Sequence, residues 1–424
     1  MADLLNYGHE ASTELSFVGD GAWEYNMSEK TQKTYLKTSL FVAKFNFMRI
    51  LFVALMLFSF SYFTYSQTSD GLKLNQIQII GSHNSYKKLP DPRVMKFLMK
   101  FKKQLGKSQD PKGIDYGHLP IDSQFSDYHV RGLEIDIHND PKGGAFYKRK
   151  INLLVRGMHQ NSHIEALRKP GFKVLHIKDV DYQTYYYTFI DALTALRQWS
   201  DAHPKHLPLF INIETKTGGP GDASGFLRFI GFKREIPYDA AACDSIDAEL
   251  RAVFGNELHN ILTPDRLRGR YSSLEEMVKQ NGWPQLDDCR GKIIFIMLGD
   301  AKSTYAHGHP SLSGRAMCTY SSPGQPECAF IMQDDAVSDS STIVQLVKDG
   351  YIVRTRSDAE TTASRENDSR AKNAAFASGA QITSTDYYKP DLRFSTFEVQ
   401  WDGKHAGRIN PISCPAKTGW LTEP

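Results

Sequence analysis

The stretch RGLEIDIHND, residues 131–140, has the pattern that decides the fold. Its apolar residues alternate with Glu134 and Asp136, as in a β-strand whose successive side chains point to opposite faces. We therefore expect an apolar face packed against helices and two carboxylates side by side on the other face. A solvated edge strand is the weaker interpretation, because one face of the strand is wholly apolar. Two neighbouring carboxylates repel each other unless a cation lies between them, which predicts a metal site or, as the alternative, a salt-bridge network.

Short apolar runs separated by helical stretches continue along the rest of the chain. Strands are predicted at Ile77–Ile80, Leu133–Ile137, Lys173–His176, Pro208–Ile213, Ile293–Leu298, Ala329–Met332, Ile352–Arg354 and Gln381–Thr383. Helices are predicted at Tyr187–Ser200, Ile246–Phe254, Ser340–Lys348 and Thr361–Ser378. Strands that alternate with helices indicate a parallel sheet, and this number of strands favours an α/β fold, a distorted (β/α)8 TIM-like barrel with loop insertions. An open doubly wound sheet is the alternative, but no GxGxxG or Walker motif follows any strand.

The overall composition excludes several classes of protein. The 424 residues include 51 Lys and Arg against 48 Asp and Glu, a net charge of +3. This near balance argues against a nucleic-acid-binding protein, which usually carries a basic excess. Five cysteines exclude a disulfide miniprotein, and the lack of a CxxC pair argues against a structural zinc site. Cys318 and Cys328 are close enough in sequence to form a disulfide if the protein is exported.

The N-terminal region contains a targeting signal. Residues 50–63 read ILFVALMLFSFSYF, with no charge, after Lys44 and Arg49. A basic start, a short apolar run and small residues before Ser66 predict a signal peptide at residues 48–66. We expect translation to start at Met48, residues 1–47 to form no domain, and residues 67–424 to form one catalytic barrel that is secreted or periplasmic. An uncleaved membrane anchor and a buried core helix are the alternatives.

Oxygen-bearing residues follow or end several of the predicted strands. Asn84 follows the strand in IIGSHNSY, and Glu214 ends the strand in HLPLFINIETK. Together with Glu134 and Asp136 they provide one amide oxygen and three carboxylates. Such an all-oxygen set suits Ca²⁺ ahead of Mg²⁺, and does not suit Zn²⁺.

Two histidines and three basic residues occupy similar positions. His83 precedes Asn84, and His176 ends the predicted strand in VLHIKD, so both can transfer protons. Basic residues suited to an anion follow later strands, namely Lys216, Arg354 and Arg356. A histidine after an apolar run is often purely structural, and so is an arginine in a barrel wall. Taken together, a cation, two histidines and basic residues at strand ends predict phosphodiester cleavage.

The motifs GSHNSY, GLEIDIH, VLHIKD and PLFINIETK, in this order, resemble the phosphatidylinositol-specific phospholipase C superfamily. GYIVRTRSDAE and SGAQITSTDYY are similar to its bacterial calcium-dependent branch, and the resemblance runs from about Leu74 to Asp386. It implies a distorted TIM barrel that cleaves phosphatidylinositol to diacylglycerol and an inositol phosphate. The resemblance implies that His83 and His176 are catalytic, that Asn84, Glu134, Asp136 and Glu214 bind Ca²⁺, and that Lys216, Arg354 and Arg356 contact the phosphate or the inositol.

A lipid substrate implies transient contact with a membrane surface. Residues 89–107, LPDPRVMKFLMKFKKQLGK, form a basic amphipathic stretch that predicts such contact. The alternative is an insertion helix packed on the core with a solvated basic face. A related glycerophosphodiester or sphingolipid phosphodiesterase is the rival enzyme. Glycerophosphodiesterases usually have an HRG motif after the first strand, and this chain has SHN there, which argues against them. A catalytically silent barrel that binds lipid head groups is the rival of another class, and we expect a monomer in either case.

Overall fold

The computed structural model describes residues 14–18, 22–26, 33, 71–105, 110–401, 403 and 405–423. The chain divides into two units, residues 1–68 and 69–424. In the first, β1 (Glu14–Val18) and β2 (Ala22–Asn26) pair antiparallel as a hairpin. The predicted start at Met48 and the predicted signal peptide lie outside the described residues. The absence of a domain in residues 1–47 stays a prediction.

Eight parallel strands form the barrel of the second unit. In ring order they are β3 (Ile77–Ser82), β4 (Gly132–His138), β6 (Leu209–Thr215), β7 (Ile293–Gly299), β8 (Cys318–Thr319), β9 (Phe330–Asp335), β10 (Ile352–Arg356) and β11 (Ile382–Thr385), which pairs with β3. The ring is completed by one parallel bridge between Tyr320 and Phe330. The predicted (β/α)8 barrel is therefore confirmed.

The pairing between β3 and β4 is the tightest point of the ring. It rests on one register pair, Gly81 opposite Gly132. A Cβ atom added at Gly132 would lie 3.0 Å from the Cα atom of Gly81, so the two strands approach each other closely. Each of these strands carries part of the candidate site at or near its carboxyl end.

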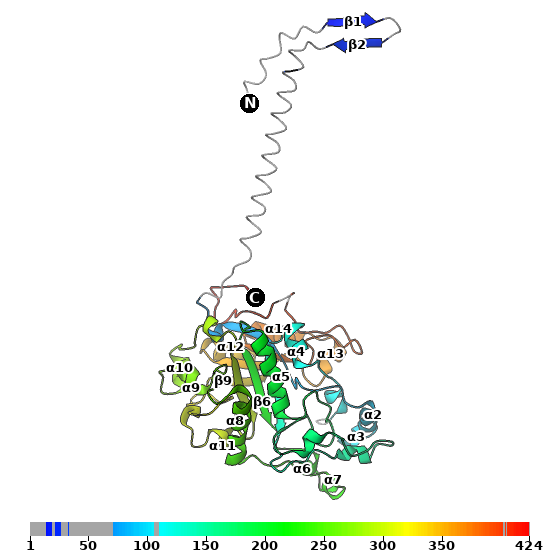
Figure 1. The fold of residues 1–424 in the computed structure, drawn as a ribbon, viewed down its shortest axis with the longest axis vertical. Helices are drawn as coiled ribbons and strands as arrows, with labels where there is room; N and C mark the ends of the chain where they lie inside the picture. Colours follow the sequence, from blue (N-terminus) through cyan, green and yellow to red (C-terminus); the bar gives the residue numbers. More distant parts are fainter. Residues whose placement is uncertain are drawn as a thin grey trace. The chain divides into compact units, whose positions relative to one another are not determined.

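Helices surround the barrel (Figure 1). They are α2 (Pro92–Lys100), α3 (Lys102–Leu105), α4 (Ile121–Ser126), α5 (Phe189–Ala202), α6 (Pro220–Ala223), α7 (Gly225–Phe229), α8 (Ala240–Phe254), α9 (Pro264–Arg268), α10 (Leu274–Lys279), α11 (Lys302–Ala306), α12 (Ser340–Lys348), α13 (Thr362–Glu366) and α14 (Arg370–Ser378). The apolar face of β4 packs in the same buried cluster as α5 and α8, as its alternating pattern predicts. Among the described residues, no helix has both the length and the apolar character needed to cross a bilayer.

Four details of the sequence prediction were wrong. Lys173–His176 is not a barrel strand, because β5 (Lys173–Val174) has two residues and pairs antiparallel with the end of β4. The missing barrel strand is β8, which sequence patterning did not reveal. The helix predicted at Thr361–Ser378 is two helices, because Asn367 has a φ of 53°, in the left-handed region. Cys318 and Cys328 are not paired, since all five cysteines are free and buried.

Two short strands close the C-terminal part of the unit. β12 (Gly407–Ile409) pairs antiparallel with the beginning of β3 and with β13 (Trp420–Leu421). They lie beside the amino end of β3, whereas the candidate site lies beside the carboxyl ends of the barrel strands. Active sites of this fold are built at the carboxyl ends.

Candidate active site

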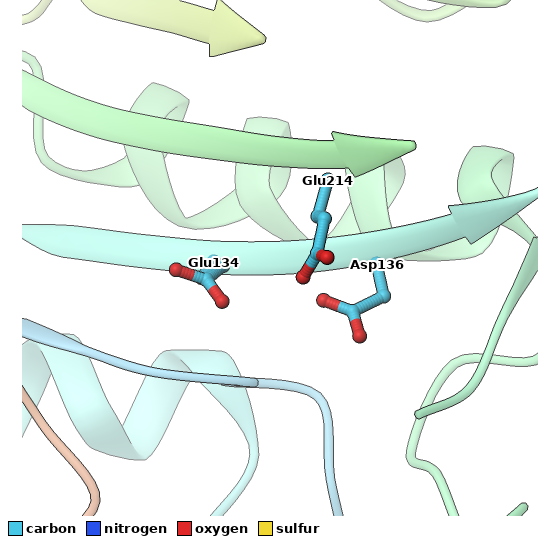
Figure 2. A group of neighbouring side chains, drawn as sticks. All are labelled: Glu134, Asp136 and Glu214. Atoms are coloured by element: carbon cyan, nitrogen blue, oxygen red, sulfur yellow. The ribbon is translucent and has the colours of Figure 1, made fainter. Parts of the chain in front are cut away.

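Three carboxylates from two adjacent strands point toward one another (Figure 2). Glu134 and Asp136 come from β4, and Glu214 lies opposite Asp136 on β6. Each offers an oxygen, and these three oxygens lie within 4.8 Å of one another. Burial raises the pKa of Glu134 to about 7 and the pKa of Asp136 well above its ordinary value. The predicted sharing of one face is confirmed, and the cluster is electrostatically costly unless cations neutralise it.

Two basic side chains neutralise this cluster in the structure. Lys216 places its Nζ atom 3.1 Å from a carboxylate oxygen of Asp136 and 3.1 Å from one of Glu214. Burial opposes its charge, but these two carboxylates outweigh that effect and raise the pKa of Lys216. Arg354 donates to Glu134 at 2.6 Å with one terminal nitrogen. The salt-bridge network expected as an alternative is therefore present, and each of its cations touches a predicted metal ligand.

Asn84 is the fourth residue of the predicted ligand set, and its amide lies against Asp136. Its backbone has a φ of 50°, a conformation that asparagine tolerates better than most residues. One end of its amide lies 2.9 Å and 3.2 Å from the two carboxylate oxygens of Asp136, and the other end lies 2.7 Å from the hydroxyl of Tyr116. With the nitrogen toward Asp136, the amide donates to the carboxylate. With the oxygen toward Asp136, the amide oxygen and the carboxylate face each other as two oxygen ligands, and a hard metal ion fits between such groups.

His83 lies beside this group and is held on both ring nitrogens. Its Nδ1 atom lies 2.8 Å from Asp386, and its Nε2 atom lies 3.1 Å from a guanidinium nitrogen of Arg356 and 3.3 Å from Glu134. Burial and the charge of Arg356 hold the pKa of His83 well below its ordinary value. In a neutral imidazole that donates from Nδ1 to Asp386, Nε2 is an acceptor, and in the structure it accepts from Arg356.

His176 has its own carboxylate partner. It follows β5 in a tight turn, and its Nδ1 atom lies 2.9 Å from Asp181. The same carboxylate lies 3.2 Å from the Nζ atom of Lys87, which is completely buried. Burial lowers the pKa of His176, while Asp181 opposes that shift and favours the imidazolium. The second histidine is thus oriented with Nδ1 toward its partner.

The two arginines predicted to contact phosphate differ in their surroundings. Arg354 has both terminal nitrogens engaged by carboxylates, Glu134 on one and Asp334 on the other, and its side chain is 3% exposed. Arg356 donates to Asp386 at 2.8 Å, and its side chain is 15% exposed. Arg356, at the end of β10 and beside His83, is the better placed of the two to contact a substrate.

The structure connects all nine predicted site residues through contacts or shared partners. Eight of them form one continuous network around the carboxylates. His176 joins it through Asp181 and Lys87, because the Nζ atom of Lys87 lies 4.4 Å from the ring centre of Tyr116, the residue that contacts Asn84. All nine residues therefore lie in one region of the described structure.

Four residues of the site were not found from the sequence. They are Lys87, Tyr116, Asp181 and Asp386. Asp386 directly follows β11, so the rule that located His83 would have located it too. Asp181 has no signal beyond its spacing of five residues from His176. Tyr116 lies in the long β3–β4 connection, where no periodicity points to a function.

Comparison with known proteins adds a family to this geometry. The model of the family described as phosphoinositide phospholipase C, Ca²⁺-dependent, matches residues 72–411. A calcium-dependent phosphoinositol-specific phospholipase C from a Pseudomonas species is similar over 81% of this chain and 97% of its own, with 16% identity and a TM-score of 0.48. A Ca²⁺-dependent phosphatidylinositol-specific phospholipase C from Streptomyces antibioticus covers 74% of this chain and 94% of its own, with 16% identity and a TM-score of 0.42. No curated protein matches.

Proposed function

The chain belongs to the calcium-dependent phosphoinositide phospholipase C family, and from this premise we propose how it cleaves phosphatidylinositol. The enzyme is a phosphodiesterase whose cofactor is Ca²⁺. One observation carries the proposed mechanism. Two histidines, each held at Nδ1 by a buried aspartate, flank a cluster of oxygen ligands at the carboxyl ends of the barrel strands.

The ligand set proposed for Ca²⁺ is Asn84, Glu134, Asp136 and Glu214. A bound Ca²⁺ ion lowers the pKa of a coordinated hydroxyl and neutralises phosphate charge. Asp136 and Glu214 would hold Ca²⁺ only if Lys216 moved away from them, because its ammonium group lies 3.1 Å from both carboxylates. We propose that the ammonium group of Lys216, once displaced from these carboxylates, contacts the substrate phosphate.

The chain's own residues provide the proton transfers. We assign His83 as the group that takes the proton of the inositol 2-hydroxyl, because Asp386 and Arg356 keep its Nε2 atom an acceptor. The oxygen then attacks the neighbouring phosphorus. His176 donates a proton to the glycerol oxygen as it leaves, with Asp181 stabilising its imidazolium form. The products are diacylglycerol and an inositol phosphate.

Glu134 is the second candidate for the general base. It is one of the proposed Ca²⁺ ligands, and its carboxylate lies 3.3 Å from His83, so it is close enough to take the same proton. Proton removal by either group predicts the same products. The two assignments differ in the turnover that a variant of His83 retains, which is low if His83 is the base and close to wild type if Glu134 is the base.

Alanine variants of the two histidines test the mechanism. His83→Ala and His176→Ala should each reduce turnover by about 10²–10⁴-fold, the usual contribution of a positioned acid or base. His307→Ala is the matched control, because this histidine is exposed. Near wild-type turnover by His176→Ala would contradict its role as the acid. Near wild-type turnover by His83→Ala would transfer the role of base to Glu134.

Contact with a membrane surface is the second part of the proposal. Three segments that follow β3, β4 and β6 share one apolar cluster, to which α2 contributes Val94 and Leu98. Their outward-facing side chains are among the largest exposed apolar groups of the described chain, namely Leu89, Met99, Phe101, Leu153, Leu154, Phe226 and Phe229. Because parallel strands end on the same side of the barrel, these groups lie on the side where the active site opens. We propose that this face contacts the lipid surface.

The structure changes which residues should make that contact. The apolar side of α2 is largely packed against the protein, as the insertion-helix alternative expects, with Val94 and Leu98 buried. Phe226 and Phe229 on α7 are 69% and 88% exposed. Burial of a phenylalanine in an apolar phase contributes about 1.5–3 kcal/mol. We therefore assign the strongest membrane contact to α7.

Export, a monomeric state and the absence of nucleic-acid binding are further parts of the proposal. Export rests on the apolar segment at residues 50–63, and the absence of nucleic-acid binding rests on the near balance of charge. N-terminal sequencing of the protein recovered outside the cell tests the first. A chain that begins close after Ser66 is expected, and one that retains residues 1–47 would contradict both the cleavage site and the proposed start at Met48.

A further inference from the structure

A cavity of about 420 Å³ lies beside the long connection between β4 and β6. Four of its lining residues are basic, namely Lys148, Lys150, Arg168 and Lys233. It shares no lining residue with the carboxylate cluster or with the two catalytic histidines. Its volume is within the range of about 300–1,000 Å³ that is usual for small-molecule sites.

The charge in this cavity is poorly compensated. Lys148, Lys150 and Lys233 have no carboxylate within 4.0 Å in the described part of the chain, and Arg168 pairs only with the exposed Glu165, at 3.3 Å. The single acidic residue in the lining is Asp179. A concave surface with several cations and one carboxylate concentrates anions.

The side chains of Lys148, Arg168 and Lys233 are exposed and that of Lys150 is partly buried, while the backbone beside the cavity is closely packed. Gly143 and Gly144 both have positive φ, 74° and 83°. A Cβ atom at Gly143 would lie 2.2 Å from the carbonyl oxygen of Arg168, whereas one at Gly144 would meet nothing within 4 Å. The guanidinium of Arg168 lies 3.7 Å from the ring centre of Tyr147. The backbone is therefore packed against the segment of Arg168 at Gly143, whereas Gly144 borders open space.

The backbone of Lys150 is anchored, and its side chain reaches a second segment. Its backbone N–H donates to the carboxylate of Asp179 at 3.0 Å. Its Nζ atom would lie 3.4 Å from a Cβ atom at Gly231, so the lysine spans the space between two segments. Two segments far apart in sequence therefore meet at this cavity, one with Lys150 and the other with Lys233.

Exposed apolar side chains flank both segments. Leu153 and Leu154, 57% and 42% exposed, come shortly after Lys150, and Phe229, 88% exposed, comes four residues before Lys233. A basic cavity whose lining segments also carry exposed apolar side chains matches a lipid surface, where phosphate groups lie next to the acyl region. We infer that this cavity binds the phosphate monoester of an anionic lipid head group, at a site separate from the one where cleavage takes place.

This inference goes beyond the proposed function and does not depend on turnover. A phosphate monoester carries up to two negative charges and three acceptor oxygens, so it matches several ammonium and guanidinium donors at once. A soluble phosphate monoester shares this chemistry but lacks the acyl chains. The flanking apolar residues favour the lipid, because they would otherwise remain in water.

Vesicle binding by a pair of double variants tests the inference. The protein is sedimented without Ca²⁺ with phosphatidylcholine vesicles that contain phosphatidic acid. Lys150→Gln/Lys233→Gln removes two charges inside the cavity. Lys96→Gln/Lys100→Gln is the matched control, because it removes two exposed charges from α2 on the same proposed membrane face. Melting temperatures of both variants check folding.

We expect the cavity variant to bind these vesicles at least tenfold more weakly than the α2 variant. Equal losses would show that only the general surface charge matters and would overturn the inference. Calorimetric titration with glycerol 3-phosphate distinguishes a soluble phosphate monoester from a lipid head group as the ligand. Binding that is weakened only in the cavity variant supports the phosphate chemistry, whereas binding of glycerol 3-phosphate without any binding to phosphatidic acid vesicles would contradict a lipid ligand.

Discussion

Asp386→Asn should slow catalysis without removing the metal site. In the structure, one oxygen of Asp386 accepts from Nδ1 of His83 at 2.8 Å, and the other accepts from Arg356 at 2.8 Å. The side chain is 1% exposed, so water cannot replace it. Asparagine has the same shape but loses the charge and one of the two acceptor atoms. A hydrogen bond to a charged group contributes about 1.5–3 kcal/mol, which corresponds to a loss of about 10–150-fold in kcat.

The assay for this prediction is the initial rate of release of inositol phosphate from phosphatidylinositol vesicles at saturating Ca²⁺. We expect kcat to fall while the Ca²⁺ concentration for half-maximal activity stays unchanged, because Asp386 touches none of the proposed Ca²⁺ ligands. Asp368→Asn is the matched control, since Asp368 pairs with Arg370 at 2.7 Å on the surface. Surface pairs of this kind contribute about 0–1 kcal/mol. Wild-type kcat in a folded Asp386→Asn variant would refute the positioning of His83 by this carboxylate.

Three further variants test other parts of the account. Lys216→Gln should bind Ca²⁺ several-fold more tightly in a calorimetric titration, because the ammonium group no longer competes for the carboxylates; weaker binding would contradict the competition. Burial raises the pKa of Asp179 to about 6, so the folded state holds this proton more tightly than the unfolded state and loses stability as the pH rises from about 4 to 6. Asp179→Asn should therefore be more stable than wild type by roughly 2–3 kcal/mol in urea unfolding at pH 8 and equal to it at pH 3, and equal stability at both pH values would contradict the shift. Phe226→Ser/Phe229→Ser should bind phosphatidylinositol vesicles at least tenfold more weakly, and unchanged binding would exclude α7 from the membrane contact.

The barrel was predictable where a strand was long enough to show its pattern. β4 alternates over seven residues, so both its strand character and the shared face of Glu134 and Asp136 followed from the sequence. β8 has two residues, and no period can be read from two positions. Lys173–His176 looks equally apolar, but its partner is the end of β4 in the opposite direction, a pairing that depends on tertiary structure.

The candidate site was predictable to the extent that its residues lie at strand ends. His83, Asn84 and Glu214 were found because strand ends converge at one side of a parallel barrel. The groups that orient them were missed, since Tyr116 and Asp181 lie in connections whose path the sequence pattern does not determine. The ion pairs of Lys216 were not predicted for the same reason. Its spacing of two residues from Glu214 places it near the site but does not show which carboxylates it contacts.

One measurement tests the central claim most directly. The purified protein is incubated with phosphatidylinositol, phosphatidylcholine or glycerophosphoinositol, each in excess chelator and again after Ca²⁺ is restored, and the products are separated. The account predicts diacylglycerol and an inositol phosphate from phosphatidylinositol, only when Ca²⁺ is present. Full cleavage of phosphatidylinositol in chelator would contradict the metal site built from Asn84, Glu134, Asp136 and Glu214. Cleavage of glycerophosphoinositol with phosphatidylinositol left intact would contradict the lipid substrate.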